Sequence, residues 1–298
     1  MIKRLNSFLE NKDLKINYVD VGARDDISEL LKKIQVNLNV YGFETDPNEN
    51  ELLNKKFPNR KYYEYGLWSS KKNLELFVTN DPSSSSLYKP NISENSNYKD
   101  SFHDNRKIIK QLKVNVVKMD DLIKISPDFI KIDTQGSEYE IIRGAIKILE
   151  NNCPLISLET WTRDVYKGSP TFEKIIPILT DLGYEILDME LCAAEKHKTK
   201  HVVQSKQTVS GYEIVFGRKN LEMIGDNDIK LKYILLLDLF GYRDLALFLN
   251  EKYLNNSDLE SYILENGKLI NNLSVLIKKS FRIFQQRIIG EPFFKISD

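Results

Sequence analysis

The chain has 298 residues, with 43 Lys and Arg against 43 Asp and Glu, so its formal net charge is zero. A chain of this length can bury a sizeable core as one α/β domain with an appendage. A neutral composition gives no support for nucleic-acid binding through a broad basic surface, and it is not typical of an acidic disordered protein.

Strand-like and helix-like segments alternate in the first part of the chain. We expect strands at residues 16–21, 40–43 and 61–65, and helices at residues 27–34 and 49–57. This alternation favours a parallel sheet with helices on both faces. Because the crossovers are right-handed, the carboxyl ends of the strands share one edge of the sheet.

A less regular insert follows. Residues 74–78 and 114–117 have the pattern of short strands, and residues 81–86 read Asp-Pro-Ser-Ser-Ser-Ser, which predicts a polar turn or loop. Residues 91–104 are rich in Asn, Ser and Asp. We expect them to form a mobile surface segment.

The alternation then resumes. We expect strands at 129–132 and 155–158, and helices at 137–149 and 171–182. Residues 184–189 and 212–216 look like the arms of a hairpin around a polar, Lys-rich segment at 193–207. A mostly parallel sheet that ends in an antiparallel hairpin is the Rossmann-like seven-stranded sheet of methyltransferases. The predicted fold class is therefore α/β of this type.

The pattern becomes helical after about residue 220. Residues 229–253 and 259–289 have helical spacing, with Gly241 and Gly267 as candidate breaks. We therefore divide the chain into a ligand-binding domain at residues 1–220 and a helical appendage at residues 221–298. The apolar residues of the appendage suit a core or the interface of a homo-oligomer; examples are Leu235, Leu239, Leu245 and Leu249.

The last part of this appendage is locally basic. Its cations are Lys278, Lys279, Arg282 and Arg287. We interpret them as a solvated helix face, with contact to a membrane or an anionic acceptor as the alternative.

The cysteines and the hydropathy of the chain indicate in which cellular compartment we expect the protein. Cys153 and Cys192 are far apart and belong to no CxxC pattern, so neither a disulfide scaffold nor a zinc site is expected. A reduced, cytoplasmic protein is the simpler interpretation. No signal peptide is visible, and the most apolar stretch, residues 233–240, is too short to span a membrane.

The first candidate site is the turn after the first strand. Gly22 follows Val19-Asp20-Val21, and glycine permits a tight turn and the close approach of a ligand. An ordinary strand–helix turn is the alternative, because one glycine is a weak form of a nucleotide-binding pattern. Glu44 ends the second strand about 20 residues later, where an acid can accept both ribose hydroxyls of a nucleoside. Asp46 fits the role of cap for the next helix better than Glu44 does.

The second candidate site is the turn after the strand at 129–132. Asp133 ends this strand and Glu138 follows a polar turn, so both lie at the same edge as Gly22. An acid there can position an acceptor or accept its proton. The alternative is that Glu138 caps a helix, where its charge is favoured.

Taken together, these motifs resemble the FkbM-like methyltransferases. The segment "IKIDTQGSEYEIIRGA" at residues 130–145 looks like the signature of that family. Further family features occur in order: "VDVGA" at 19–23, "YGFETDP" at 41–47, "SSSL" at 84–87 and "MDDL" at 119–122. The similarity covers roughly residues 15–217.

The resemblance implies that the cofactor is S-adenosylmethionine. Asp20, Gly22 and Ala23 would lie on its methionine and ribose side, and Glu44 with Thr45 would hold the ribose. Gly66 and Leu67 would approach the adenine, with Asp120 as a further candidate there. Asp133 and Gln135 would lie near the transferred methyl group. The chain departs from the family at Arg24-Asp25-Asp26, where a second glycine often follows; Arg24 either takes part in binding the methionine carboxylate or is solvated.

A hydroxyl acceptor benefits from a base that receives its proton. The candidates are Asp133, Glu138, Glu159, which ends the strand at 155–158, and the three histidines, His103, His197 and His201. We predict Asp133, Glu159 and His197 as the catalytic residues, although a solvated surface role is the alternative for each histidine. Trp161 could form a wall for a sugar ring or serve packing. Asp133, Glu159 and a histidine could converge on a metal, which is the alternative, but no ligand spacing requires one, so no metal site is predicted.

The leading hypothesis is an S-adenosylmethionine-dependent O-methyltransferase. The family suggests a sugar, glycan or related small molecule as the acceptor, and no nucleic acid. A nicotinamide-dependent oxidoreductase is one alternative, but the first turn lacks GxGxxG. A non-catalytic interaction module with the methyltransferase fold is the other.

Overall fold

The computed structural model describes residues 2–151, 153–201, 203–222 and 224–270. Their contacts form two compact units, each described here by itself: Asn6–Tyr233, and the residues up to Leu5 together with those from Ile234 onward. The basic residues Lys278, Lys279, Arg282 and Arg287 lie outside the described residues. The domain boundary at residue 220 stays a prediction.

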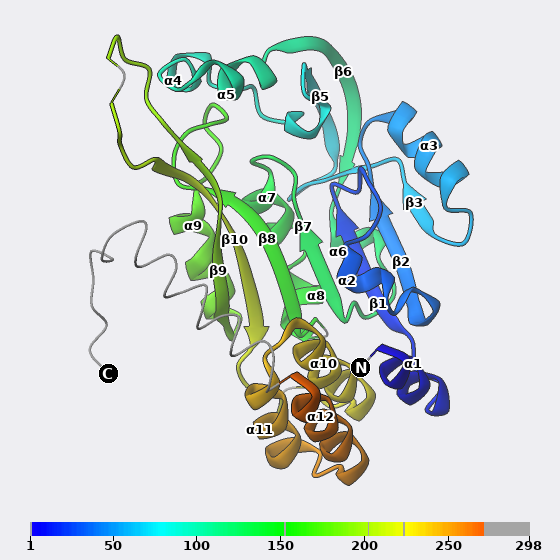
Figure 1. Cartoon of the computed structure of the whole chain (residues 1–298). Coiled ribbons are helices and arrows are strands. Elements are labelled where there is room, and N and C mark those ends of the chain that lie inside the picture. The colour runs from blue at the N-terminus through cyan, green and yellow to red at the C-terminus, as the bar shows by residue number, and fades with distance from the viewer. Residues whose placement is uncertain (1, 152, 202, 223, 271–298) are drawn as a thin grey trace. The chain divides into compact units, whose positions relative to one another are not determined.

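A seven-stranded sheet forms the centre of the larger unit, in the order β3-β2-β1-β7-β8-β10-β9 (Figure 1). The first five strands in this order are mutually parallel, and β10 is antiparallel to both β8 and β9. The predicted parallel sheet with a terminal hairpin is therefore confirmed. The strands are β1 (Ile16–Val21), β2 (Leu38–Phe43), β3 (Lys61–Tyr63), β7 (Phe129–Ile132), β8 (Leu155–Trp161), β9 (Tyr184–Glu195) and β10 (Thr208–Arg218).

Short helices connect the parallel strands. They are α2 (Glu29–Lys32), η1 (Gln35–Asn37), α3 (Pro47–Lys56), α6 (Met119–Leu122), α7 (Glu138–Arg143), α8 (Ile146–Asn151) and α9 (Phe172–Asp181). Buried apolar residues of β1, β7 and β8 pack with those of α6, α7, α8 and α9 in one core. Because both faces of the central strands are covered, β7 and β8 are almost continuously buried.

The single helix predicted over 137–149 is in fact two helices, α7 and α8. They are separated at Gly144, where a side chain would place its Cβ 2.1 Å from the carbonyl oxygen of Trp68. The carbonyl of Gly144 accepts a hydrogen bond from the backbone N–H of Asp120 at 3.0 Å instead of continuing a helix. Helix α7 therefore ends because Gly144 packs closely against Trp68 and because its carbonyl is bonded to the N–H of Asp120.

The insert between β3 and β7 forms a second, three-stranded sheet in the order β4-β6-β5. Its elements are β4 (Gly66–Leu67), β5 (Lys72–Thr79), η2 (Pro82–Ser84), α4 (Ile92–Asn95), α5 (Asp100–Asn105) and β6 (Ile108–Val117). The prediction that residues 91–104 form a surface segment holds for much of its length, since Ile92, Ser93, Ser96 and Asn97 are exposed, but the segment carries α4 and α5, and Asn95, Tyr98 and Phe102 are buried. The polar residues serve the local structure: the side chain of Asn91 caps α4, and Asn95 Nδ2 donates to the carbonyl of Val165 at 3.1 Å.

Helices dominate the C-terminal part, as expected. α10 (Asn227–Phe240), α11 (Arg243–Tyr253) and α12 (Ser257–Ile270) follow one another, and α1 (Ile2–Asn11) begins the chain. Gly241 separates α10 from α11 with a φ of 99°, whereas α12 continues through Gly267, so the break predicted there is wrong. Leu235, Leu239 and Leu249 are buried. Among the described residues, every helix is too short or too polar to cross a membrane.

Candidate functional site

The turn after β1 requires a glycine. Gly22 has a φ of 84°, and a Cβ there would lie 1.9 Å from the carbonyl oxygen of Asp133. The N–H groups of Gly22 and Ala23 both donate to the carbonyl of Phe43 at 3.0 Å. The ends of β1, β2 and β7 are thereby held against one another, and only a residue without a side chain allows that approach.

A pocket lies at this carboxyl edge of the sheet, where open α/β sheets bind their ligands. Seven of the residues expected to bind the cofactor contribute to its lining: Asp20, Gly22, Glu44, Thr45, Leu67, Asp133 and Gln135. They come from β1, the segment after β2, β4 and the turn after β7. The fold therefore brings together residues that are up to 115 positions apart, between Asp20 and Gln135.

Glu44 and Asp46 divide the two roles that the sequence suggested. The carboxylate of Asp46 accepts from the N–H of Asn48 at 3.0 Å and caps α3. Glu44 Oε1 accepts from the N–H of Asp46 at 2.7 Å, and the side chain lines the pocket although Glu44 is only 7% exposed. Burial raises the pKa of Glu44 to about 7, and the Asp46 N–H opposes this rise.

A half-buried cation in the pocket lining lies between two acids. Lys131 Nζ is 3.3 Å from Asp133 Oδ2 and 3.8 Å from Asp20 Oδ1. Burial acts to lower the pKa of Lys131, but the two carboxylates outweigh it and the pKa is raised. Burial also raises the pKa of Asp20, against the attraction of Lys131. Lys131 was not among the predicted site residues, although its place two residues before Asp133, on the same side of the strand, could have indicated it.

Gln135 connects the pocket to the neighbouring strand. Its backbone is left-handed, with a φ of 58°, and its Nε2 donates to Asp133 Oδ1 and Glu159 Oε1, each at 3.1 Å. Burial raises the pKa of Glu159 to about 7, with the charge of Asp133 as the next cause. Glu159 is half-buried and lies behind Gln135 rather than in the pocket lining.

Glu138 braces the turn after β7 and does not line the pocket. Its Oε1 accepts from the N–H of Thr134 at 3.1 Å, from Thr134 Oγ1 at 3.0 Å and from the N–H of Gly136 at 3.0 Å. Burial raises its pKa to about 7. We therefore place Glu138 in the structure of the turn rather than in proton transfer, contrary to its inclusion among the candidate bases.

The Ser-rich segment after η2 covers one side of the pocket. Ser85, Ser86 and Leu87 belong to the lining, and Ser86 Oγ donates to the carbonyl of Gln135 at 2.7 Å. Arg24 reaches this segment, because its Nη1 donates to the carbonyl of Pro82 at 3.1 Å. Its Nη2 forms an ion pair with Glu49 at 3.1 Å. Arg24 thus links the turn after β1 to the Ser-rich segment. The sequence had left two roles open for Arg24, binding of the methionine carboxylate and exposure to solvent, and this structural link is neither of them.

Three residues expected at the cofactor lie outside the pocket lining. Ala23 is buried in a cluster with Leu53 and Tyr62. Gly66 packs against Val116, whose Cγ1 would lie 2.8 Å from an added Cβ. Asp120 accepts from the N–H groups of Lys147 and Ile148 at 3.2 and 3.1 Å, and so caps α8. Its position does not support a contact with adenine, because both of its oxygens are engaged by the helix.

His197, predicted to be catalytic, lies away from the pocket lining in the β9–β10 connection. It is exposed, pairs with Tyr98 in an isolated bridge, and its ring is 4.8 Å from the ring of Tyr98. Its contacts support a structural role in joining the hairpin to the insert. His103 lies on α5, and His201 is exposed.

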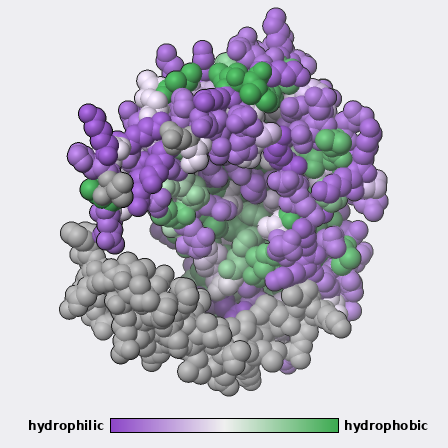
Figure 2. Space-filling model, turned by 45° about the horizontal axis from the view of Figure 1, so that its top comes forward, coloured by the Kyte–Doolittle hydropathy of each residue, from purple (hydrophilic) through white to green (hydrophobic). Residues whose placement is uncertain are grey.

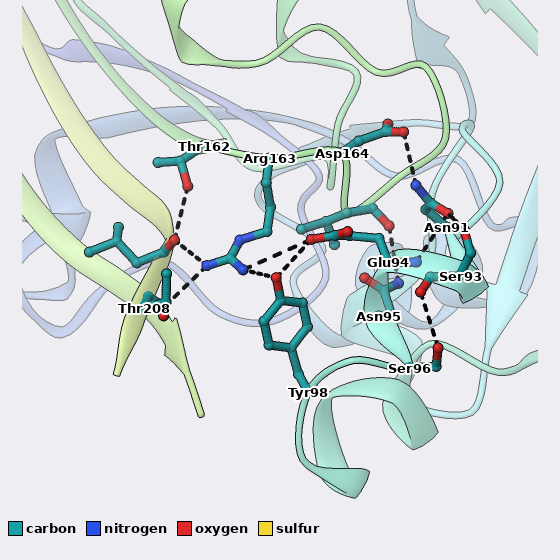
Figure 3. Close-up of polar contacts among 12 residues, drawn as sticks. Asn91, Ser93, Glu94, Asn95, Ser96, Tyr98, Thr162, Arg163, Asp164 and Thr208 are labelled. Atoms are coloured by element: carbon teal, nitrogen blue, oxygen red, sulfur yellow. Dashed lines mark hydrogen bonds and ion pairs between the residues drawn. The ribbon is translucent and has the colours of Figure 1, made fainter. Parts of the chain in front are cut away.

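Figure 3 shows how the insert is fastened to the end of β8. Arg163, which follows β8, makes the connection: it is hydrogen-bonded to the hydroxyl of Tyr98 in the insert, and it donates to the carbonyl of Thr208 in β10 at 3.2 Å. Tyr98 in turn donates to Glu94 Oε1 at 2.7 Å. Trp161 is buried in the adjoining apolar cluster, which supports its packing role over that of a wall for a sugar.

Within the described residues, no group of three or more His, Cys, Asp or Glu side chains could hold a metal ion. The pocket combines the Gly22 turn with the acid Glu44 after β2. Near the end of β7, the cation Lys131 lies between the acids Asp20 and Asp133. Such a pocket can hold a nucleoside by its ribose and place a cationic group beside carboxylates.

Comparisons with known proteins agree with this picture. The sequence model of a family described as "Methyltransferase FkbM domain" matches residues 20–186, which is more than half of the chain. A solved structure of an FkbM methyltransferase from Methylobacillus flagellatus KT is 15% identical with a TM-score of 0.40, over 67% of this chain and 43% of that one. The chain thus spans less than half the length of that protein.

Two further solved structures are similar. Magnesium protoporphyrin IX methyltransferase from Synechocystis PCC 6803, with bound SAM, is 9% identical with a TM-score of 0.37, over 73% of this chain and 77% of that one. Precorrin-6y C5,15-methyltransferase from Geobacter metallireducens GS-15 is 16% identical with a TM-score of 0.36, over 73% and 86%. No curated protein matches the chain.

Proposed function

Because the chain belongs to the FkbM methyltransferase family, we propose that it transfers a methyl group from S-adenosylmethionine to a hydroxyl group of its acceptor. The observation that carries this proposal is the position of Glu44 at the pocket rim beside the Gly22 turn. An acid after β2 and a glycine after β1 are what a bound nucleoside with a charged tail needs at this edge.

The polar groups of the pocket fit this cofactor. Among the described residues, Asp20 Oδ1 is buried and has the ion pair with Lys131 at 3.8 Å but accepts no hydrogen bond, so it can receive one from the amino group of a methionine moiety. Glu44 Oε1 is bonded to Asp46, which leaves its other oxygen for ribose hydroxyls. Asp20 and Asp133 supply negative charge at the end where a sulfonium would lie.

S-adenosylmethionine, when bound, supplies an electrophilic methyl group, so the protein mainly aligns donor and acceptor and excludes water. Gly22, Glu44 and Asp20 would bind the cofactor. Asp133 and Glu159, joined by Gln135, stand beside the transfer end and can hold or move a proton. The position of His197 in the β9–β10 connection gives no support to a catalytic role for it.

The favoured acceptor is the hydroxyl of a sugar, a glycan or a related small molecule. Its support is the family; in addition, the coloured part of the face in Figure 2 is mostly hydrophilic, with hydrophobic residues in separate patches. Both described cysteines are free, which suits a reducing compartment such as the cytoplasm. A homo-oligomer formed through the C-terminal helices stays a prediction.

Calorimetry and a transfer assay test this proposal. We expect the wild type to bind S-adenosylmethionine and S-adenosylhomocysteine, and to transfer labelled methyl from the former to a mono- or oligosaccharide in a panel. Absence of binding to either nucleoside would overturn the proposal. Binding of NADH instead would favour the oxidoreductase, and cofactor binding without transfer to any sugar or small molecule would favour the non-catalytic module.

A further inference from the structure

Gln135 is held in an unusual position between two carboxylates. Its φ of 58° is rare for a residue other than glycine, and such conformations persist where the surroundings fix them, often at functional sites. Two hydrogen bonds fix the turn: Ser86 Oγ donates to the carbonyl of Gln135 at 2.7 Å, and the N–H of Gly136 donates to Glu138 at 3.0 Å. The amide group of Gln135 then reaches both Asp133 and Glu159.

Tyr166 lies at the oxygen end of the Gln135 amide. Its hydroxyl lies 2.9 Å from Gln135 Oε1 and 2.9 Å from the carbonyl of Ser84. The hydroxyl has one proton to share between these two acceptors. Ionised carboxylates only accept hydrogen bonds, so the NH₂ group of Gln135 is the one directed at Asp133 and Glu159, and its Oε1 faces the hydroxyl. Tyr166 is itself fully buried, and the guanidinium of Arg106 in the insert lies 5.7 Å from the centre of its ring. A chain of contacts therefore runs from the insert to the two carboxylates.

The two carboxylates differ in what remains free. Asp133 uses both oxygens, Oδ1 with Gln135 at 3.1 Å and Oδ2 with Lys131 at 3.3 Å. Glu159 uses Oε1 with Gln135, whereas its Oε2 accepts no hydrogen bond from any residue in the described part of the chain. Glu159 is also half-buried, so this oxygen can be approached from outside. Glu159, not Asp133, has room to receive a proton.

The charged and titratable groups around Glu159 come from every element packed against it. They are Lys131 on β7, Asp133 directly after it, Glu138 on α7, Cys192 on β9, Glu213 on β10 and Tyr166 after β8. Only Lys131 in this set is a cation. Burial and the neighbouring acids raise the pKa of Glu159 to about 7, which is suited to a general base at neutral pH.

We propose that Glu159 receives the proton of the acceptor hydroxyl, and that Gln135 and Tyr166 are positioning residues that hold it for this step. The proposal rests on the methyl transfer proposed above. The acceptor oxygen forms a bond to the methyl carbon while the carbon–sulfur bond breaks, and sulfur keeps the electron pair of that bond. The hydroxyl proton passes to Oε2 of Glu159, which returns it to solvent before the next turnover.

Carboxyl titration tests the positioning without any ligand. In protein labelled with ¹³C at the glutamate carboxyl carbons, the signal missing in Glu159→Gln identifies Glu159, and we expect it to titrate near pH 7. Tyr166→Phe removes only the hydroxyl, and Gln135→Asn shortens the amide while tolerating the left-handed backbone. Each should raise the Glu159 midpoint by about one pH unit, because the hydrogen bond to the carboxylate is weakened.

Tyr184→Phe is the matched control, because Tyr184 is also a buried tyrosine whose hydroxyl bonds backbone carbonyls, here of Leu149 and Cys153. It should leave the midpoint unchanged. A Glu159 midpoint in the ordinary range of glutamate, or one that is the same in the wild type, Tyr166→Phe and Gln135→Asn, would overturn the proposal.

Proton transfer itself is tested with the sugar that the wild type methylates. Glu159→Gln should lower kcat by about 100-fold or more while the affinity for S-adenosylhomocysteine changes little. An unchanged kcat contradicts the role of Glu159. Loss of cofactor binding by the wild type would instead overturn the proposed function, so the two failures are distinguishable.

Discussion

Replacement of Glu44 by glutamine should weaken cofactor binding and change its pH dependence. The side chain lines the pocket, and only one of its oxygens is bonded within the protein, to the N–H of Asp46 at 2.7 Å. A hydrogen bond from a ribose hydroxyl to a buried carboxylate is worth about 1.5–3 kcal/mol. Its loss in Glu44→Gln corresponds to a Kd for S-adenosylhomocysteine that is about 10- to 150-fold higher.

The pH dependence has a definite sign. Burial raises the pKa of Glu44 to about 7, so the side chain is largely protonated in the free protein at pH 6. Ribose hydroxyls bind better to the carboxylate, so binding releases a proton below pH 7 and the affinity should rise from pH 6 to pH 8. The rise is at most about tenfold per pH unit below the pKa. In Glu44→Gln, this increase of the affinity with pH should be lost.

Calorimetry of S-adenosylhomocysteine at pH 6, 7 and 8, in buffers of different ionisation enthalpy, measures both the Kd and the proton release. Glu51→Gln is the control, because Glu51 is an exposed acid on the helix that follows Glu44, α3, where it pairs with Lys55. The reasoning about Glu44 is refuted if Glu44→Gln binds as the wild type does, with the same proton release.

Three further predictions concern the same edge of the sheet. Gly22→Ala should abolish S-adenosylhomocysteine binding and lower the free energy of unfolding by about 2 kcal/mol or more, because its Cβ would lie 1.9 Å from the Asp133 carbonyl oxygen; wild-type binding and urea stability would contradict this. Glu138→Ala should lower the free energy of unfolding by about 2–4 kcal/mol, since it leaves three turn donors without their acceptor, and an unchanged urea midpoint would argue against that bracing role. The pKa values of Glu44, Glu138 and Glu159 are each raised to about 7, so from pH 4.5 to 7 the folded state binds more protons than the unfolded state at these groups. Their contribution to the free energy of unfolding should therefore fall as pH rises from 5 to 8. In urea titrations, the free energy of unfolding of Glu138→Gln should fall less steeply with pH than that of the wild type. Equal slopes against pH would contradict the raised pKa of Glu138.

Most of the sheet could be predicted from sequence because its signals are local. Residues 16–21 and 129–132 are largely apolar segments that end at turn residues, and they correspond to β1 and β7, respectively. The hairpin was predicted in kind but not in length, because β9 extends to Glu195 and β10 already begins at Thr208. These strand ends are paired with each other, a contact that no local pattern encodes.

The insert could not be predicted in the same way, because its polar residues are buried by tertiary contacts. Asn95 is rare as a core residue, yet its amide is bonded to the carbonyl of Val165, 70 residues away. The split between α7 and α8 likewise depends on Trp68, which comes from the insert. Composition alone favours exposure for Asn-rich segments, and long-range hydrogen bonds override that preference.

The candidate site was predictable at strand ends and less so elsewhere. Glu44 and Asp133 follow strands directly, so their edge is determined by the topology. The capping of α8 by Asp120 could not be predicted, because its partners in that helix are 27 and 28 residues away. Lys131 and Tyr166 were missed, since a cation in a strand and a tyrosine in a loop gain their roles only from side chains brought near them by the fold.

A crystal structure of the complex with S-adenosylhomocysteine tests the central claim most directly. The account predicts that the ribose hydroxyls lie within hydrogen-bond distance of Glu44, that the methionine moiety lies beside Gly22 and Asp20, and that the sulfur faces Asp133. A ligand that binds outside this pocket, or one whose ribose makes no contact with Glu44, would contradict it.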